Sequence, residues 1–256
     1  MTALDIQIIP ALSDNYVYLV RDPESGACAA VDPAAAAPVL EAVSRLGWKL
    51  GLILCTHHHA DHIGGVVEIK KATGCTVVGA AADAPRIPGI DVKVKEGDAV
   101  ALGAHAGRVI ETPGHTSGHI AYWFEGARAL FCGDTLFSLG CGRLFEGTPA
   151  QMWKSLLKLR SLPDDAQVYC GHEYTSDNVA FALSLDPDNP AISRRADEAL
   201  ALGEAGRPTL PARLGDEKAT NPFLRADHDP IKEAVGLAGQ DAVEVFAEIR
   251  RRKDEF

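Results

Sequence analysis

The sequence predicts an α/β body followed by a helical C-terminal region. Short β-branched segments alternate with helical segments over residues 1–173, whereas residues 174–256 have helical periodicity interrupted by prolines. Hydrophobic residues make up 46% of the 256 residues and charged residues 23%, which is typical of a globular protein. We therefore predict two domains, 1–173 and 174–256.

Strands are predicted where short apolar or β-branched runs lie between turn residues. In chain order these runs are Ile6–Ile9, Tyr16–Val20, Cys28–Val31, Leu50–Cys55, Thr76–Val78, Val92–Val94, Gly107–Glu111, Ile120–Phe124, Ala129–Cys132 and Gln167–Cys170.

Helices are predicted where apolar residues recur at helical spacing. The first follows Asp32-Pro33, which has the residue types of an N-cap and a first helical position, and ends at Gly47, which suits a C-cap. The other predicted helices are Asp61–Ala72, Ala150–Leu159, Ser176–Leu185, Ala191–Gly203, Ile231–Ala238 and Val243–Arg252.

Charge and cysteine content argue against several classes of protein. The formal net charge of −10 does not favour a broad basic surface for nucleic acid. The six cysteines form no C-x-x-C pair, which indicates buried, reduced thiols rather than a zinc ribbon. No apolar run approaches the ~18 residues of a membrane span, and no basic residue precedes Arg21, so we expect neither a transmembrane helix nor a signal peptide. We expect a cytoplasmic protein with no nucleic-acid or membrane partner.

The residues most informative about function form the run T-H-H-H-A-D-H at 56–62, where a strand ends and a helix begins. Side chains alternate along extended backbone, so His57 and His59 point to the same side and can bind one cation. Asp61 and His62 open the next helix and can face a second cation. His58 points the opposite way, and we interpret it as a residue that supports the structure or orients a ligand rather than as a ligand itself.

Three later residues have the surroundings of further ligands. His115, Asp134 and His172 each occur in a turn-like context at a predicted strand end, beside a glycine that lets backbone approach an ion closely. The complete set offers nitrogen and oxygen donors and no thiolate. It therefore predicts two divalent ions and favours zinc, with iron and manganese left open.

These motifs resemble those of the metallo-β-lactamase superfamily, in which a run like T-H-H-H-A-D-H precedes P-G-H-T, G-D and G-H motifs. The resemblance implies an αββα sandwich, here with a C-terminal helical domain, and a binuclear site along one edge of the packed sheets. It implies that His57, His59 and His115 bind the first ion and that Asp61, His62 and His172 bind the second. It also implies that Asp134 bridges the two ions. Asp61 and Asp134 are then the catalytic carboxylates.

Within that superfamily the chain is similar to glyoxalase II, the hydroxyacylglutathione hydrolases, over essentially its whole length. The similar segments are C-G-R-L-F-E-G-T at 141–148, Y-C-G-H-E-Y-T at 169–175, N-P-F-L-R at 221–225 and R-R-R-K-D at 250–254. The likeness implies that the glutathione moiety contacts Arg143, Tyr174, Arg250 and Lys253. Phe145 departs from the family, which often has tyrosine there, so a hydroxyl contact to the substrate would be absent.

The resemblance implies hydrolysis of S-D-lactoylglutathione to D-lactate and glutathione, the second step of methylglyoxal detoxification. Two ions roughly 3.5–4 Å apart can lower the pKa of a bridging water toward 7, so that a metal-bridging hydroxide attacks the carbonyl. A glutathione thiolate is a good leaving group because the pKa of its thiol is near ~8.5, and no strong general acid is needed. We expect a monomer that acts on a small glutathione thioester.

Other functions stay open at this point. Lactamases, lactonases and persulfide dioxygenases of the superfamily share the ligand pattern, although the helical tail with its Arg/Lys cluster disfavours them. A nuclease needs a basic surface or a nucleic-acid-binding insertion, and a binding module without catalysis leaves a full ligand set unused. Of the remaining histidines, we interpret His119 as a residue that supports the structure or orients a ligand, and His105 and His228 as surface groups.

Overall fold

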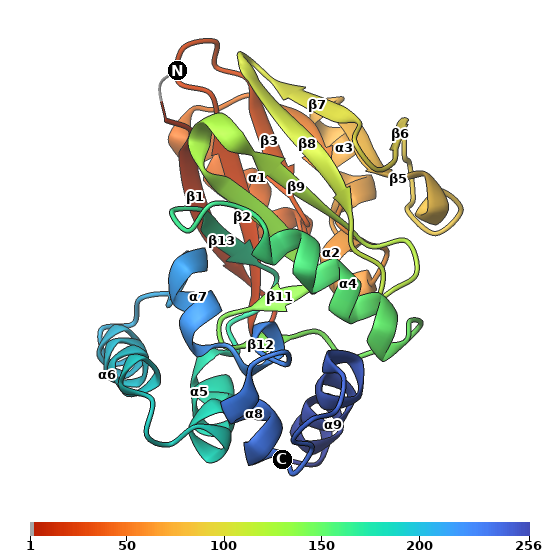
Figure 1. The fold of residues 1–256 in the computed structure, drawn as a ribbon. Helices are drawn as coiled ribbons and strands as arrows, with labels where there is room; N and C mark the ends of the chain where they lie inside the picture. Colours follow the sequence, from red (N-terminus) through yellow and green to blue (C-terminus); the bar gives the residue numbers. More distant parts are fainter. Residues whose placement is uncertain (1–2) are drawn as a thin grey trace. The chain divides into compact units, whose positions relative to one another are not determined.

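The computed structural model describes residues 3–256, which form two compact units (Figure 1). Within these residues, unit 1 comprises 3–111 and 116–133, and unit 2 comprises 112–115 and 134–256. Residues 1 and 2, at the start of the predicted first domain, lie outside the described residues. The predicted domain boundary after residue 173 stays a prediction.

Unit 1 begins with a mixed sheet of order β1-β2-β3-β4-β5-β6. The first three strands pair antiparallel, and the last four pair parallel. The bounds are β1 Asp5–Ala11, β2 Asn15–Arg21, β3 Cys28–Val31, β4 Leu50–Leu54, β5 Thr76–Ala80 and β6 Val92–Val94. All six overlap the predicted strands.

Helices α1 (Ala36–Leu46) and α3 (Val66–Thr73) pack against this sheet (Figure 1). Their apolar side chains, among them Val39 and Ile69, join strand residues such as Leu19 and Ile53 in one buried cluster. Burying each of these side chains stabilises the folded state by about 1.5–3 kcal/mol. The packed cluster therefore holds the ends of the strands in fixed positions.

The predicted start of the first helix is wrong. Helix α1 begins at Ala36 rather than directly after Asp32, and its N-cap position Ala35 makes no side-chain capping bond. Asp32 instead has a left-handed backbone, with φ of 48°, and its carboxylate accepts hydrogen bonds from Thr56. The predicted end is confirmed, because Gly47 is the C-cap with φ of 65°.

The single helix predicted over Asp61–Ala72 is two helices, α2 (Ala60–Ile63) and α3. Gly64 and Gly65 lie between them. A Cβ at Gly64 would lie 2.5 Å from the Ala34 carbonyl oxygen, and one at Gly65 would lie 2.7 Å from the Ala35 carbonyl carbon. Backbone packs directly on backbone here, so the glycines permit a close approach that helical periodicity does not reveal.

Unit 1 also contains four antiparallel strands in the order β10-β9-β8-β7. Their bounds are β7 Ala99–Leu102, β8 His105–Glu111, β9 Ile120–Phe124 and β10 Ala129–Gly133, and short 3₁₀ turns occur at η1 Ala81–Asp83 and η2 Glu125–Ala127. The sequence did not predict β7. His105, expected at the surface, is buried on β8, with its Nε2 3.9 Å from Asp22 Oδ1, so that expectation is wrong.

Unit 2 contains most of the helices. Its elements are β11 Leu136–Phe137, β12 Gly140–Cys141, α4 Pro149–Arg160, β13 Gln167–Cys170, α5 Thr175–Leu185, α6 Pro190–Glu204, β14 Ala212–Arg213, α7 Leu214–Thr220, η3 Pro222–Leu224, α8 Asp229–Ala234 and α9 Ala242–Glu255. The predicted helices are present, although α8 is shorter and ends before Gly236, whose φ is 77°. The short strands β11, β12 and β14 and helix α7 were not predicted.

Among the described residues, no helix has the length and apolar character needed to cross a membrane.

Candidate metal centre

Thr56 anchors the histidine run where β4 ends. Its backbone N–H donates to Asp32 Oδ1 at 2.7 Å, and its hydroxyl donates to Asp32 Oδ2 at 2.6 Å. Its carbonyl accepts the backbone N–H of Ile120 at 2.9 Å. The run therefore starts from a residue fixed by both the backbone and the side chain.

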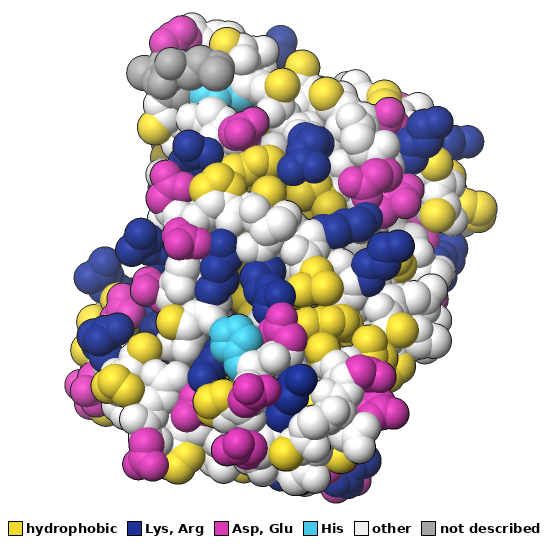
Figure 2. Space-filling model, in the orientation of Figure 1, with side chains coloured by type: hydrophobic (Ala, Val, Ile, Leu, Met, Phe, Trp, Pro, Cys, Tyr) yellow, Lys and Arg dark blue, Asp and Glu magenta, His cyan; other side chains and the backbone are white. Residues whose placement is uncertain are grey.

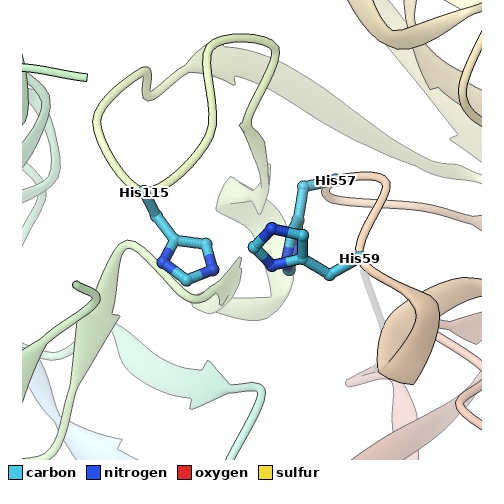
Figure 3. A group of neighbouring side chains, drawn as sticks. All are labelled: His57, His59 and His115. Carbon is cyan, nitrogen blue, oxygen red and sulfur yellow. The ribbon is translucent and has the colours of Figure 1, made fainter. Parts of the chain in front are cut away.

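His57 and His59 lie together, as the alternation of side chains predicted, with ring centroids 4.8 Å apart (Figure 3). His57 is buried, and its Nδ1 is 3.0 Å from Thr56 Oγ1. Because the single hydroxyl hydrogen of Thr56 goes to Asp32, Thr56 Oγ1 accepts the hydrogen on His57 Nδ1. The lone pair of His57 is then on Nε2, the nitrogen available to a cation.

The Asp32 carboxylate, which accepts both hydrogen bonds from Thr56, also orients His62 on α2. His62 Nδ1 is 3.1 Å from Asp32 Oδ2, and a carboxylate can only accept, so Nε2 is again the nitrogen available to a cation. Next to it, Asp61 Oδ2 is 3.5 Å from His62 Nε2 and accepts a 3.1 Å hydrogen bond from the Asn15 side chain. Asp32 and Asn15 thus hold donor groups in place, and the sequence had assigned neither residue to the site.

In unit 2, Asp134 lies between two histidines. Its Oδ2 is 3.4 Å from His115 Nε2 and 3.3 Å from His172 Nε2. His115 Nδ1 is 2.9 Å from the Arg143 carbonyl oxygen, which can only accept, so the lone pair of His115 is on Nε2. The central position of this carboxylate is what a ligand shared by two ions requires.

The structure contains three groups of residues that could hold an ion. Each residue of a group offers one ligand atom, and the ligand atoms of a group all lie within 4.8 Å of one another. The groups are Asp32, His57 and His62; His57, His59 and His115 (Figure 3); and Asp61, His62 and His172. The donors are imidazole nitrogens and carboxylate oxygens, which suit a divalent ion such as zinc. Because the Nδ1 hydrogens of His57, His62 and His115 go to acceptors, their Nε2 atoms are ready to bind, and the residues present fit such ions.

Two further histidines lie beside these groups but belong to none of them. His58 Nδ1 is 3.2 Å from Oδ2 of the buried Asp83, and the ring of His119 stacks on that of His57 at 4.7 Å. Both contacts agree with the structural roles expected from the sequence. His228 is exposed, as expected.

The predicted substrate contacts in unit 2 have different surroundings. The Arg143 side chain is 67% exposed and has Nε 3.7 Å from Asp254 Oδ1. The ring of Tyr174, partly exposed, stacks on His172 with centroids 4.7 Å apart and planes 4° from parallel. Lys253 Nζ donates to the Asp177 carbonyl at 3.1 Å and lies over the rings of Phe181 and Phe256.

Arg250, in contrast, is only 6% exposed. Its guanidinium donates to the Cys141 carbonyl at 2.9 Å and pairs with Asp254 at 2.7 Å. These contacts give Arg250 a role within the protein, and the predicted contact with substrate stays a prediction.

The six cysteines of the described residues are buried, as predicted, and each is a free thiol. Burial raises the pKa of the Cys141 thiol to about 11 and the pKa of the Cys170 thiol well above its ordinary value. A thiol needs to ionise to attack a carbonyl, so neither cysteine is suited to act as a nucleophile.

Comparison with known proteins places the fold and these donors in the metallo-β-lactamase superfamily, because the family model described as "Metallo-beta-lactamase superfamily" matches residues 12–172. The model described as "Hydroxyacylglutathione hydrolase C-terminus" matches residues 173–256. The chain belongs to the hydroxyacylglutathione hydrolase family, and the resemblance seen in the sequence is confirmed.

Full-length relatives agree with this assignment. The hydroxyacylglutathione hydrolase of Rhodospirillum rubrum is 61% identical over all of both chains. That of Methylococcus capsulatus is 58% identical over 99% of each chain. Among solved structures, ETHE1 from Myxococcus xanthus is 28% identical, covers 98% of this chain and 90% of its own, and has a TM-score of 0.70. The B3 metallo-β-lactamase BLEG-1 is 21% identical, covers 86% of this chain and 99% of its own, and has a TM-score of 0.66, which shows a common fold.

Proposed function

We propose that this chain hydrolyses 2-hydroxyacylglutathione thioesters, S-D-lactoylglutathione above all, to glutathione and the 2-hydroxy acid. The observation that carries the proposal is full-length identity of 61% to a hydroxyacylglutathione hydrolase, including the C-terminal region. The candidate metal groups support the proposal, because ions held there would supply the Lewis acidity that this reaction needs.

For the metal ligands, we propose the assignment implied by the sequence. His57, His59 and His115 would hold one ion, and Asp61, His62 and His172 the other, in agreement with two of the three candidate groups. The contacts of Asp134 with His115 and His172 support its role as the shared ligand. Two divalent ions bound there would supply Lewis acidity to the thioester carbonyl and to water. Zinc is the ion that this donor set favours.

The chain's own residues would act by holding protons at defined atoms. Asp32, Thr56 and the Arg143 carbonyl keep the hydrogens of His62, His57 and His115 on Nδ1, respectively. The raised pKa values of the thiols near the donors argue for water as the nucleophile. The departing glutathione thiolate needs no protonation, since its thiol has a pKa near ~8.5.

For substrate recognition, we propose that Arg143 and Lys253 attract the carboxylates of glutathione and that Tyr174 contacts its peptide. The exposure of Arg143 supports this role. Phe145 is 64% exposed and packs edge-on against His115 at 5.3 Å. It would offer an apolar surface at the position where the family resemblance implies a tyrosine hydroxyl.

Acidic and basic side chains intermingle on the face drawn in Figure 2, and no continuous basic surface covers that face. This pattern gives no support to a nucleic-acid substrate. A cytoplasmic location and a monomeric state remain part of the proposal, and the reduced, buried cysteines fit a reducing compartment.

The decisive experiment is elemental analysis of metal-replete protein together with hydrolysis assays on glutathione thioesters, β-lactams and lactones. We expect about two ions per chain and turnover of the glutathione thioesters only. A stoichiometry near one with full activity, or preferred turnover of a lactam or lactone, would refute the proposal.

Two variants test the ligand assignment. Asp134→Ala should lose metal and turnover, because it removes the carboxylate that contacts both His115 and His172. His58→Ala should retain metal and measurable activity, because His58 contacts Asp83 and belongs to no candidate group. Equal behaviour of the two variants would show that the assignment is wrong.

A further inference from the structure

Strands β11 and β12 form a small hairpin whose turn, Ser138 and Leu139, is buried. Leu139 has a φ of 54°, the left-handed region that residues other than glycine seldom adopt. Buried backbone groups need protein partners because water cannot reach them. The hairpin has too few residues to satisfy its own backbone, so its conformation depends on side chains from other elements.

Those side chains come from the helical region of unit 2. Glu217 of α7 accepts the backbone N–H of Leu139 at 2.8 Å and the hydroxyl of Ser138 at 3.0 Å. Asn221, which follows α7, donates to the carbonyls of Phe137 at 3.1 Å and Gly140 at 3.0 Å.

Three more helices contact the hairpin. Arg195 of α6 donates to the hydroxyl oxygen of Ser138 at 3.2 Å. Asn178 of α5 donates to the Ser138 carbonyl at 2.9 Å, and Arg250 of α9 donates to the Cys141 carbonyl at 2.9 Å. Asn178 also closes the space beside the turn, since a Cβ at Gly140 would overlap its Nδ2. Helices α5, α6, α7 and α9 therefore all restrain the hairpin.

Glu217 and Asn221 are linked to each other, because Asn221 Nδ2 is 3.1 Å from Glu217 Oε2. Both are buried. Burial raises the pKa of the Glu217 carboxyl, and the hydrogen bonds that it accepts from Leu139, Asn221 and Ser138 oppose this rise. A buried carboxylate with this many donors is costly to disturb, so it holds the turn firmly.

The hairpin lies in sequence between Asp134 and Arg143, two residues that fix His115. A Cβ at Gly142 would overlap the Asp134 carbonyl oxygen and lie 2.9 Å from His115 Nδ1, so the backbone after β12 packs directly on this pair. The next residue, Arg143, supplies the carbonyl that accepts the hydrogen of His115 Nδ1. A shift of the hairpin would move this carbonyl and release the His115 ring.

We infer that Glu217 and Asn221 are positioning residues of the metal centre, which act through the β11–β12 hairpin on the orientation of His115. The inference rests on the proposed role of His115 and Asp134 as ligands. It gives the helical region a second task beside substrate recognition, namely to hold the unit 2 ligands in binding geometry.

The test uses Glu217→Gln and Asn221→Ser in the full chain. The glutamine of E217Q would place an amide N–H₂ among donors, whereas the serine of N221S keeps an oxygen for the Phe223 N–H but is too short to reach the hairpin. Lys218→Met is the matched control. Lys218 is also on α7 and donates to Leu162 and pairs with Asp164, so its loss lowers stability without a contact to the hairpin.

The readout is the zinc dissociation constant of folded, metal-free protein, measured by competition with a chromophoric chelator well below the unfolding midpoint. We expect about 10–100-fold weaker zinc binding in E217Q and N221S, the range found when partners of ligands are lost. The K218M variant should keep wild-type zinc affinity, although its midpoint falls. If E217Q does not fold, N221S and the milder Asn178→Ala provide the comparison.

Wild-type zinc affinity in the folded hairpin variants would overturn the inference and leave Glu217 with a role in stability alone. Equal weakening in K218M would overturn it as well. Failure of the wild-type protein to hydrolyse lactoylglutathione would instead refute the proposed function, and the zinc measurement would still decide the role of the hairpin.

Discussion

Arg250 and Lys253 lie one turn apart on α9, yet their surroundings predict different effects when each is replaced by methionine. The Arg250→Met variant leaves the buried Cys141 carbonyl without its 2.9 Å donor and Asp254 without its 2.7 Å partner. An unsatisfied buried acceptor costs about 1–3 kcal/mol, and the loss of a partly exposed ion pair adds at most about 1 kcal/mol. We take about 2–3 kcal/mol as the expected loss.

For a chain of this size, that loss corresponds to a fall in Tm of about 4–12 °C. Lys253 makes one hydrogen bond to a carbonyl and lies 5.3–5.4 Å from two phenylalanine rings. Methionine can keep the packing of its stem, so Lys253→Met should cost no more than about 1 kcal/mol of stability.

The kinetic effects should separate in the same way. A partly exposed charge contact with the substrate is worth about 1 kcal/mol, so K253M should raise KM for lactoylglutathione about fivefold with kcat unchanged. The effect should shrink at high salt and be absent for a thioester that lacks the peptide carboxylates. R250M should lower kcat or metal content, because it releases the hairpin at Cys141.

The assays are thermal unfolding of the metal-free protein and steady-state kinetics on both thioesters. The reasoning is refuted if R250M keeps the wild-type Tm and raises only KM, since Arg250 would then contact substrate in place of the hairpin. It is equally refuted if K253M affects both thioesters alike.

Three single residues carry the remaining predictions. Hydrogen bonds from the Ser25 hydroxyl and from the backbone N–H groups of Glu24 and Ala104 lower the pKa of Asp22 to about 2. A carboxyl with a lowered pKa contributes its full stabilisation above the unfolded value of 3.8, and this contribution is lost as pH falls toward 2. Urea unfolding of metal-free Asp22→Asn should therefore show a smaller loss of stability between pH 3.8 and pH 2 than that of the wild type. Gly142→Ala should lower the bound metal measured by elemental analysis, because its Cβ would overlap the Asp134 carbonyl oxygen; full metal content would contradict the packing described here. Phe145→Tyr should leave stability within about 0.5 kcal/mol, because the ring is 64% exposed, and should lower KM for glutathione thioesters; an unchanged KM would show that the position does not contact substrate.

Local patterns in the sequence were sufficient to predict most strands and helices. The pairing of His57 with His59 followed from alternation in extended backbone, and the ring separation of 4.8 Å confirms it. Gly47 was identified as a C-cap from its residue type, and it has the left-handed φ that this position requires. In each case the deciding interaction lies within a few residues of the chain.

The wrong predictions at Asp32 and His105 arise from contacts between residues that are far apart in the chain. Asp32 has the residue type of an N-cap, but the parallel pairing of β3 with β4 brings Thr56 next to it. The Asp32 carboxylate then accepts two hydrogen bonds from Thr56 in place of a capping bond. His105 is buried because β7 and β8 pair in a hairpin that the sequence did not show. The β11–β12 hairpin was missed since its strands are too short to display a period.

The same distinction between local sequence patterns and contacts made by the fold applies to the candidate metal centre. The sequence motifs name the candidate ligands, because four of them lie in one short run and the others stand beside glycines in short motifs. The acceptors that decide which nitrogen is available come from distant positions: Asp32 for His62 and the Arg143 carbonyl for His115. Orientation of the ligands is thus a property of the packed fold, and substitutions that disturb it, such as those at Glu217 or Gly142, should reduce metal affinity although every ligand is still present.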